Sequence, residues 1–259
     1  MSQSDAPQGA PASEINYAAY LALNQLLSLQ RTLSRPEHPD ELLFMVVHQA
    51  SELWFKVVLH ELEALVARMQ DKNALGALYT VGRLNALTRI VTAQLSALDT
   101  LPPQHFAQFR SFLGTSSGSQ SSQFRAIEAA SGLREPHFLH AISEHGEPPE
   151  IVREWLARPT LQALFDGMVS EAGTTYEELY TGPGPSALVL LAEGLLEYEQ
   201  SFSLWRFLHV QLVERVIGPG TGGTGGTLGA RYLQRTISTR FFPRLWEVRA
   251  KFFGAAKKD

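Results

Sequence analysis

The sequence predicts an all-α protein, a helical bundle formed by one large domain. Apolar residues recur at helical spacing along most of the 259-residue chain. The period-2 alternation with β-branched residues that marks strands is nearly absent. A hydrophobic content of 44% is enough for a chain of this length to bury a substantial core. No internal repeat is visible, so a solenoid is not expected.

The first predicted helices lie before residue 100. Residues 1–14 are small, polar and proline-bearing, so we expect a disordered tail, with a single all-α domain over 15–259. Apolar spacing predicts a helix over 17–30. Asp40 is expected to cap a long central helix that ends near residue 69. A helix over 74–98 follows and is broken by two prolines.

The rest of the chain alternates between helices and loops made of turn-forming residues. A helix that includes residue 106 passes into the loop GTSSGSQSS, and TGPGPS connects two later helices. A glycine-rich run comes near the end of the chain. The remaining helices are predicted over residues 122–130, 148–157, 161–171, 187–218 and 231–253.

Composition excludes several functional classes. The formal net charge is −4, with basic and acidic residues mixed along the chain, so we expect neither a nucleic-acid partner nor binding to an anionic membrane. No apolar run approaches the roughly 20 residues that span a bilayer, and the start of the chain lacks the features of a signal peptide. We therefore expect a cytoplasmic protein. Because there is no cysteine, any metal must be bound by nitrogen or oxygen.

His209 lies in the apolar stretch LWRFLHVQLVERVIG. On a helical wheel the apolar Phe202, Trp205 and Leu212 surround it, whereas Arg206 falls on the opposite, polar half. One interpretation is a core histidine whose ring nitrogens are hydrogen-bonded, and position alone favours it. The alternative is a metal or haem ligand, since a neutral imidazole in an apolar wall suits a flat, apolar macrocycle.

His48 lies where the apolar and polar sides of the 40–69 helix meet, next to Phe44. Glu52 follows one helical turn later, so the pair resembles half of a metal site. A third ligand is not evident in the sequence. A surface or packing histidine is the alternative, and it is favoured for His48 taken alone.

Two loops could contact a ligand. Arg110 precedes the serine- and glycine-rich loop, and a guanidinium is a natural bidentate partner for a carboxylate. The alternative is a flexible linker with a surface arginine. The run over 218–229 lacks the GK[ST] ending of a phosphate-binding loop, so it is either a lid over a buried site or a disordered loop.

Taken together, these segments resemble one family. The chain is similar to bacterial tryptophan 2,3-dioxygenases, haem enzymes of the all-α superfamily that they share with indoleamine dioxygenases. The segments that carry the resemblance are YAAYLALNQLLSLQ, DELLFMVVHQASELWFKVVLHEL, FRSFLGTSSGSQSSQFR, LWRFLHVQLVERVIG, TGGTLGARYL and FFPRLWEVR. They cover both ends and the early middle of the chain.

The resemblance implies a haem b cofactor and assigns site residues. His209 falls on the proximal iron ligand, and His48 falls on the distal histidine that faces the indole N–H. L-tryptophan, or a related indole amino acid, and dioxygen are the implied partners. In the family, tyrosines of an N-terminal helix enter the site of a neighbouring subunit. The matching residues here therefore imply an oligomer, which in the family is a homotetramer. The implied substrate-binding residues are Arg110 for the carboxylate, Phe44, Phe106, Ser117 and Thr224, together with Tyr17 and Tyr20 from the neighbour.

Departures from the family bear on the reaction. Phe106 stands where a tyrosine is usual, Ser119 replaces a phenylalanine, and Leu208 replaces an arginine. The lid lacks its lysine and arginine, so Thr224 is the better match to the threonine that contacts the ammonium group, with Thr221 as the rival.

The implied activity is insertion of dioxygen across the indole C2–C3 bond, which gives an N-formylkynurenine-type product. The alternative is a haem monooxygenase that forms a 2-oxindole amino acid from tryptophan or methyltryptophan, with a reductant or peroxide in turnover. Two rivals come from other classes. One is a haem-binding sensor or a catalytically silent relative, and the other is a non-haem iron or zinc hydrolase that uses His48 and Glu52.

Overall fold

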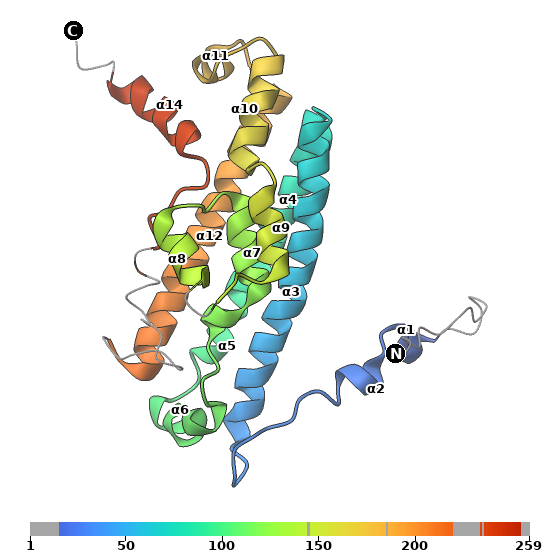
Figure 1. Cartoon of the computed structure of the whole chain (residues 1–259), viewed down its shortest axis with the longest axis vertical. Helices are drawn as coiled ribbons and strands as arrows, with labels where there is room; N and C mark the ends of the chain where they lie inside the picture. Colours follow the sequence, from blue (N-terminus) through green and yellow to red (C-terminus); the bar gives the residue numbers. More distant parts are fainter. Residues whose placement is uncertain (1–15, 144–145, 185, 220–233, 235, 255–259) are drawn as a thin grey trace.

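The prediction of an all-α fold is confirmed. The computed structural model describes residues 16–143, 146–184, 186–219, 234 and 236–254, and in these ranges it contains helices but no strand. Two long helices, α3 (Pro39–Gln70) and α12 (Ala187–Ile217), run along the body of the molecule (Figure 1). Two short N-terminal helices, α1 (Tyr17–Tyr20) and α2 (Leu23–Leu26), form an arm that projects away from this body.

The bundle is built around α4 (Ala74–Ala93), which packs against both α12 and α3. The closest approach between α4 and α12 is at Gly194, where an added Cβ would lie 2.5 Å from the Val81 side chain. Asn85 reinforces this contact by donating from Nδ2 to the Gly194 carbonyl at 3.1 Å. A glycine is therefore required for these two helices to pack at this distance.

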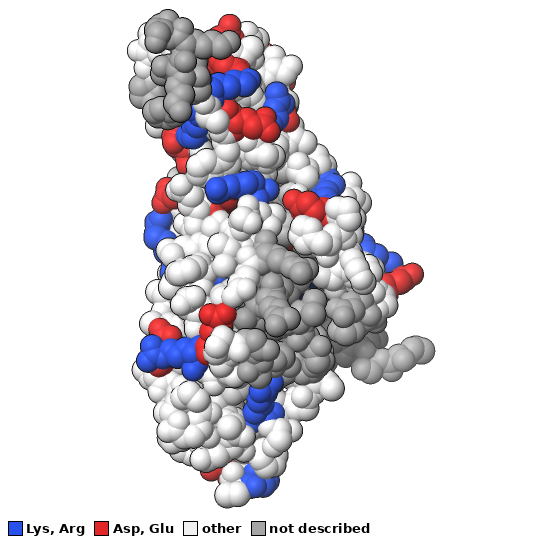
Figure 2. Space-filling view, turned by 90° about the vertical axis from the view of Figure 1, so that its left-hand side faces the viewer, with Lys and Arg blue, Asp and Glu red and all other residues white. Residues whose placement is uncertain are grey.

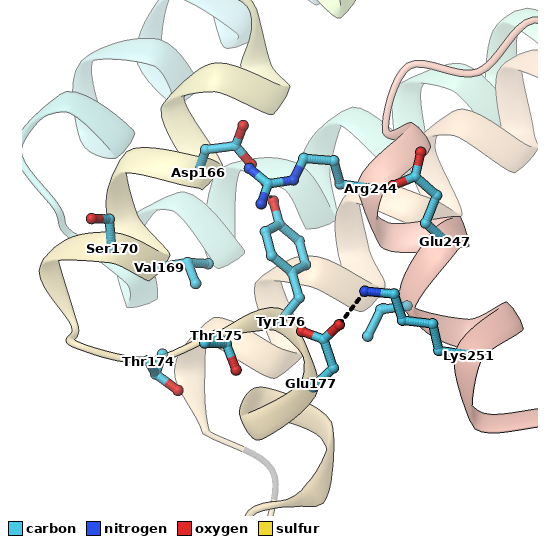
Figure 3. A pocket seen from close by; sticks show the side chains of 11 residues that line it. Asp166, Val169, Ser170, Thr174, Thr175, Tyr176, Glu177, Arg244, Glu247 and Lys251 are labelled. Atoms are coloured by element: carbon cyan, nitrogen blue, oxygen red, sulfur yellow. Dashed lines mark hydrogen bonds and ion pairs between the residues drawn. The ribbon is translucent and has the colours of Figure 1, made fainter. Parts of the chain in front are cut away.

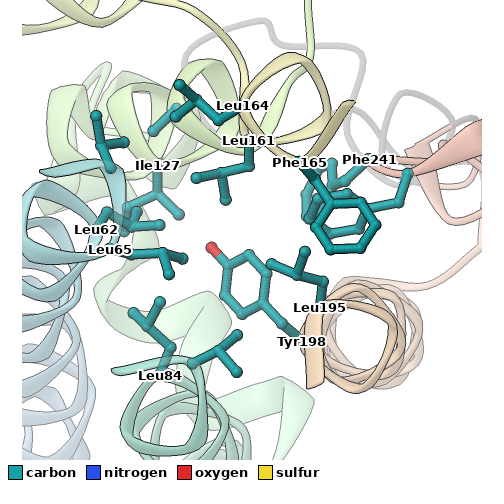
Figure 4. Close-up of a cluster of buried hydrophobic side chains, with 14 of the residues drawn as sticks. Leu62, Leu65, Leu84, Ile127, Leu161, Leu164, Phe165, Leu195, Tyr198 and Phe241 are labelled. Atoms are coloured by element: carbon teal, nitrogen blue, oxygen red, sulfur yellow. The ribbon is translucent and has the colours of Figure 1, made fainter. Parts of the chain in front are cut away.

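The core lies in the middle of the bundle, where α3, α4, α7 (Ser122–Ser131), α10 (Leu161–Glu171) and α12 contribute apolar side chains (Figure 4). Tyr198 is fully buried among them, and its hydroxyl lies 2.9 Å from the Ser131 hydroxyl. Burial raises the pKa of Tyr198, so its phenol stays neutral. This apolar core packs α3 and α12 into one bundle and so fixes their relative positions.

Glu199 fixes the C-terminal segment to α12. Its buried carboxylate accepts hydrogen bonds from the backbone N–H groups of Phe241 and Phe242, at 2.7 and 2.8 Å, and from the indole of Trp246. These contacts place α14 (Pro243–Gly254) against the bundle. The remaining helices are α5 (Leu95–Leu98), α6 (Pro103–Arg110), α8 (Pro136–Ser143), α9 (Glu150–Ala157) and α11 (Tyr176–Thr181), with 3-10 turns η1 (Ser111–Leu113) and η2 (Gly118–Gln120).

Three predicted helix limits are wrong. The 17–30 helix is interrupted at Ala22, whose φ of 49° is left-handed, and few of its apolar side chains are covered. The N-cap of α3 is His38, whose Nδ1 accepts from the Asp40 backbone N–H at 3.2 Å, with a proline as the first helical residue. Residues 237–242 are not helical, so a continuous helix over 231–253 is also wrong.

The structure also corrects the placement of Arg206. The helical wheel put it on the polar half of its helix, but its side chain is buried and bonded to the carboxylate of Glu128. A wheel cannot identify such a partner, because Glu128 is supplied by α7, far away in the sequence.

Candidate active site

The candidate site lies where α3, α6 and α12 meet, at the lower end of the body in Figure 1. The helix α6 packs against both α3 and α12 at this end. The first turns of α3 carry Phe44 and His48, α6 carries Phe106 and Arg110, and the last turns of α12 carry His209. Three helices therefore bring together side chains that are far apart in the sequence.

The His48 ring has a defined tautomer. Its Nδ1 lies 2.7 Å from the Phe44 carbonyl oxygen, which can only accept, so Nδ1 is the protonated nitrogen. His48 is an exposed residue, yet neighbouring protein atoms desolvate its ring, and this desolvation lowers the pKa of His48 below its ordinary value of 6.5. At neutral pH the ring is uncharged, and Nε2 offers a lone pair to a hydrogen-bond donor.

His209 is electrostatically coupled to His48. Burial, followed by the charge that His48 would carry, lowers the pKa of His209 to about 4, so this ring is also neutral at physiological pH. Its Nδ1 is buried and, among the described residues, has no hydrogen-bond partner. Trp205 stacks on the ring with centroids 5.0 Å apart. The ring is therefore oriented by packing, and Nε2 is the nitrogen left to bind a metal.

Aromatic side chains form a wall beside His48. The Phe44 ring lies 4.2 Å from the His48 ring and 5.4 Å from the Phe106 ring, measured between centroids. Phe109 completes the cluster at 5.8 Å from Phe44. Phe106 is 6% exposed and, because it is a phenylalanine, places no hydroxyl group in the wall. Such a surface suits a planar apolar ring.

Arg110 and Ser117 lie at the end of α6 and in the loop that follows. Arg110 is partly buried one helical turn after Phe106. Ser117 is the N-cap of η2, in a capping box with Gln120, and its hydroxyl lies 2.9 Å from the Ser119 hydroxyl. The departure from the family at position 119 thus gives Ser117 a polar neighbour within its own loop.

Two predicted site residues, Tyr17 and Tyr20, are not brought to the site within one chain. Tyr17 and Tyr20 are 75% and 78% exposed on the arm, which Figure 1 shows at a distance from the meeting point of α3, α6 and α12. Thr224 and its rival Thr221 lie outside the described residues. The roles of all four residues stay predictions.

The half metal site on α3 has a different explanation. Glu52 accepts a hydrogen bond from the Gln123 side chain at 2.8 Å, and the Glu52 carbonyl accepts another from the same amide at 2.9 Å. Within the described ranges, no cluster of three histidine, aspartate or glutamate side chains could hold a metal ion. Glu52 therefore serves to attach α7 to α3.

A separate cavity of about 350 Å³ lies at the opposite end of the molecule, between α10, α11 and α14 (Figure 3). Its charged groups bond to one another, with Arg244 3.0 Å from Asp166 and Lys251 paired with Glu177. Because these charges already satisfy each other, this cavity is a weaker candidate than the histidine site.

Comparison with known proteins identifies the family. The family model described as tryptophan 2,3-dioxygenase matches residues 1–144 and 172–252. The chain belongs to this family. The unmatched residues are 145–171 and 253–259, and the first of these segments includes α9 and the whole of α10.

Relatives named tryptophan 2,3-dioxygenase align over nearly the whole chain. The protein of Arthrobacter sp. (strain FB24) is 37% identical over 264 residues, covering 93% of each chain. That of Kineococcus radiotolerans is 37% identical and covers 92% of this chain and 91% of its own. That of Serratia proteamaculans is 34% identical, covering 93% and 94%. Membership of the family makes the chain a haem-dependent oxidoreductase.

The residues at the site fit a haem group. His209 supplies a neutral imidazole stacked on the indole of Trp205, and its buried Nδ1 has no hydrogen-bond partner within the part of the chain that the structure describes. The wheel predicted Trp205 as a neighbour of His209, but it did not predict that Phe124 extends this stack at 4.8 Å from Trp205. The apolar spacing of the 122–130 helix predicted that Phe124 is buried, but it could not predict which side chains Phe124 contacts.

Proposed function

We propose that the chain inserts both atoms of dioxygen across the C2–C3 bond of the indole of L-tryptophan or a close derivative. The product is of the N-formylkynurenine type, the cofactor is haem b, and the reaction takes place in the cytoplasm. The observation that carries this proposal is the geometry of His48, whose Nδ1 donates to the Phe44 carbonyl so that Nε2 is the nitrogen that can accept a hydrogen bond, near enough to His209 to affect the pKa of that ring. The names of the relatives support tryptophan as the substrate.

His209 holds the haem iron through Nε2 in this proposal, because Nδ1 is buried. When bound, the haem supplies the binding and activation of dioxygen. The protein then needs no strong acid or base beside the substrate. Its own residues orient the indole and exclude water from the reacting carbons.

The substrate is positioned at three points. The indole ring packs on Phe44, and its N–H donates to Nε2 of His48. Arg110 binds the carboxylate through a charge-assisted pair. Since Phe44 and His48 are one helical turn apart on α3, the apolar contact and the hydrogen bond are fixed by one rigid element.

Assembly into a homotetramer completes the site. Exposed apolar side chains on α3 recur on one face, at Leu42, Val46, Leu53 and Val57, and the arm carries exposed Tyr17 and Tyr20. Among the described helices, α3 alone is long and apolar enough to cross a membrane, by length and composition only. We assign its apolar face to subunit contacts instead, with the arm of one subunit reaching the site of another.

A second candidate reaction is insertion of a single oxygen atom to give a 2-oxindole amino acid. It is favoured by two departures at the site. Phe106 places no hydroxyl in the aromatic wall, and Ser119 bonds to Ser117 where the family has an apolar side chain. Either change alters how firmly the amino-acid end is held.

Mass spectrometry of products formed from L-tryptophan under labelled dioxygen separates these reactions. We expect two labelled atoms in one ring-opened product. One labelled atom in a 2-oxindole would establish monooxygenation instead. An intact Soret band with no product from tryptophan or methyltryptophan would contradict both and favour a haem sensor.

A further inference from the structure

A buried carboxylate on α7 connects the loop at the substrate side to the helix that carries His209. Glu128, whose side chain is 2% exposed, bonds through one oxygen to Arg206 at 2.9 Å and through the other to Arg125 at 2.8 Å. Both arginine side chains are themselves buried to nine-tenths or more. One negative charge thus holds two guanidinium groups in the protein interior.

Each arginine also donates a hydrogen bond to the backbone of a different segment. Arg125 donates from Nε to the backbone carbonyl of Ser119, in the same loop as Ser117. Arg206 donates from its guanidinium to the backbone carbonyl of Thr236 at 3.1 Å, and Thr236 follows the glycine-rich run in the sequence. Neither contact is with a side chain, so the two arginines hold the path of the backbone.

The same arginine lies beside the proximal helix turn. Arg206 is three residues before His209 on α12, and the rings of Phe202 and Phe241 flank its guanidinium at 5.4 and 5.2 Å. These aromatic contacts leave Arg206 little freedom to move. Glu128 thus connects the 111–121 loop, through Arg125, and Thr236, through Arg206, to the helical turn that carries His209.

We propose that Glu128 is a positioning residue that sets the 111–121 loop and the segment at Thr236 relative to His209. The effect of Glu128 on KM for tryptophan rests on the proposed function, whereas its effect on the order of the two backbone segments does not. Removal of its charge takes the shared counter-charge away from two buried guanidinium groups, which weakens their hold on the Ser119 and Thr236 carbonyls. The loop that carries Ser117 then loses its fixed place over the substrate.

The test uses Glu128→Gln in the full-length haem-loaded protein. We expect haem uptake and the Soret band to persist, KM for L-tryptophan to rise about tenfold or more, and kcat to change by about threefold or less. Amide hydrogen exchange is expected to become about tenfold faster in 114–121 and 236–242 but to stay unchanged in 58–66. Glu128→Asp, which keeps the charge, should restore most of the wild-type KM.

Glu61→Gln is the matched control, because Glu61 is also a buried carboxylate paired with an arginine, Arg83 at 2.8 Å. It lies about 20 Å along α3 from His48, so its loss is expected to reduce stability without raising KM. If Glu128→Gln does not fold, Arg125→Gln removes the contacts of Arg125 with Glu128 and with the loop but keeps the Arg206–Glu128 pair, so faster exchange is then expected in 114–121 and not in 236–242.

Unchanged exchange in both segments, or an equal rise of KM in the Glu61 control, would overturn the positioning role. If the wild-type protein does not turn over tryptophan, the proposed function fails, and the exchange measurement still decides the role of Glu128.

Discussion

Two histidines that are uncharged at neutral pH define the chemistry of the site. Burial lowers the pKa of both rings, to about 4 for His209. The Phe44 carbonyl oxygen fixes the proton of His48 on Nδ1. A neutral imidazole can bind iron, and a neutral distal ring can accept from an indole N–H. The two proposed roles therefore need desolvated, neutral rings and no strong base.

Replacing Arg110 tests how the substrate is held. Arg110→Leu is expected to keep the Soret band and to raise KM for L-tryptophan by about tenfold or more, because a charge-assisted pair with the carboxylate is lost. Steady-state kinetics with absorption spectra check this. Arg89→Leu on the surface of α4, which breaks the exposed pair with Glu197, is the control. An unchanged KM in Arg110→Leu would mean that the carboxylate is bound elsewhere.

The wheel placed His48 and His209 well, because a residue's own helix determines which neighbours flank it. It put His48 beside Phe44 at the edge of the apolar side, where the structure has it. It failed for Arg206, because burial of that charge depends on Glu128 from another helix. The tautomer of His48 could not be predicted from the sequence either, because it depends on the position of the Phe44 carbonyl oxygen relative to the ring.

At the scale of elements, the start of α3 is held by a buried carboxylate. Glu41 accepts from the backbone N–H groups of Leu33 at 2.6 Å and Ser34 at 2.9 Å. Burial alone would raise the pKa of Glu41, but these hydrogen bonds outweigh it, and the pKa falls below its ordinary value of 4.5. Glu41 thereby fixes the direction in which the arm leaves the bundle.

The depressed pKa predicts a pH dependence. The unfolded chain binds a proton at Glu41 at a higher pH than the folded chain does, so the stabilisation is complete above 4.5 and is lost as the pH falls through the lower, folded value. Glu41→Gln is expected to be about 2 kcal/mol less stable at neutral pH and to lose less stability on acidification. Urea unfolding at several pH values measures this, and equal slopes for both proteins would contradict it.

Apolar spacing predicted α10 with its observed limits, Leu161–Glu171, because capping and burial agree there. The same spacing over 17–30 gave a continuous helix where the structure has two short ones. Short helices gain most of their stability from packing, and little of the arm's apolar surface is covered within one chain. The apolar spacing of one sequence cannot show whether these side chains are covered within the same chain or by another copy of it.

At the scale of the whole molecule, neither sign of charge gathers into a single patch on the face that Figure 2 shows. Figure 2 shows positive and negative side chains interspersed among the described residues on that face. Exposed apolar side chains lie instead on the arm, along α3 and on α12, where they are Leu190, Leu204, Phe207 and Leu208. Association with further copies of the chain is the outcome that this distribution favours.

Removing the arm tests the assembly. A variant that lacks residues 1–30 is expected to lose the tetramer and most of its turnover, since Tyr17 and Tyr20 no longer reach a neighbouring site. A variant that lacks only 1–14 keeps both tyrosines and is expected to behave as the wild type. Light scattering after gel filtration, together with turnover, checks both. A fully active tetramer without residues 1–30 would contradict the proposed role of the arm.

The most direct test is the Soret absorption of purified His209→Ala. We expect the variant to fold but to lose the Soret band of the wild-type protein, and added imidazole to restore it by replacing the missing ligand. His60→Ala, which removes an exposed histidine from α3, should keep the band unchanged. A His209→Ala protein with the same haem content and the same Soret spectrum as the wild type would show that another residue binds the iron.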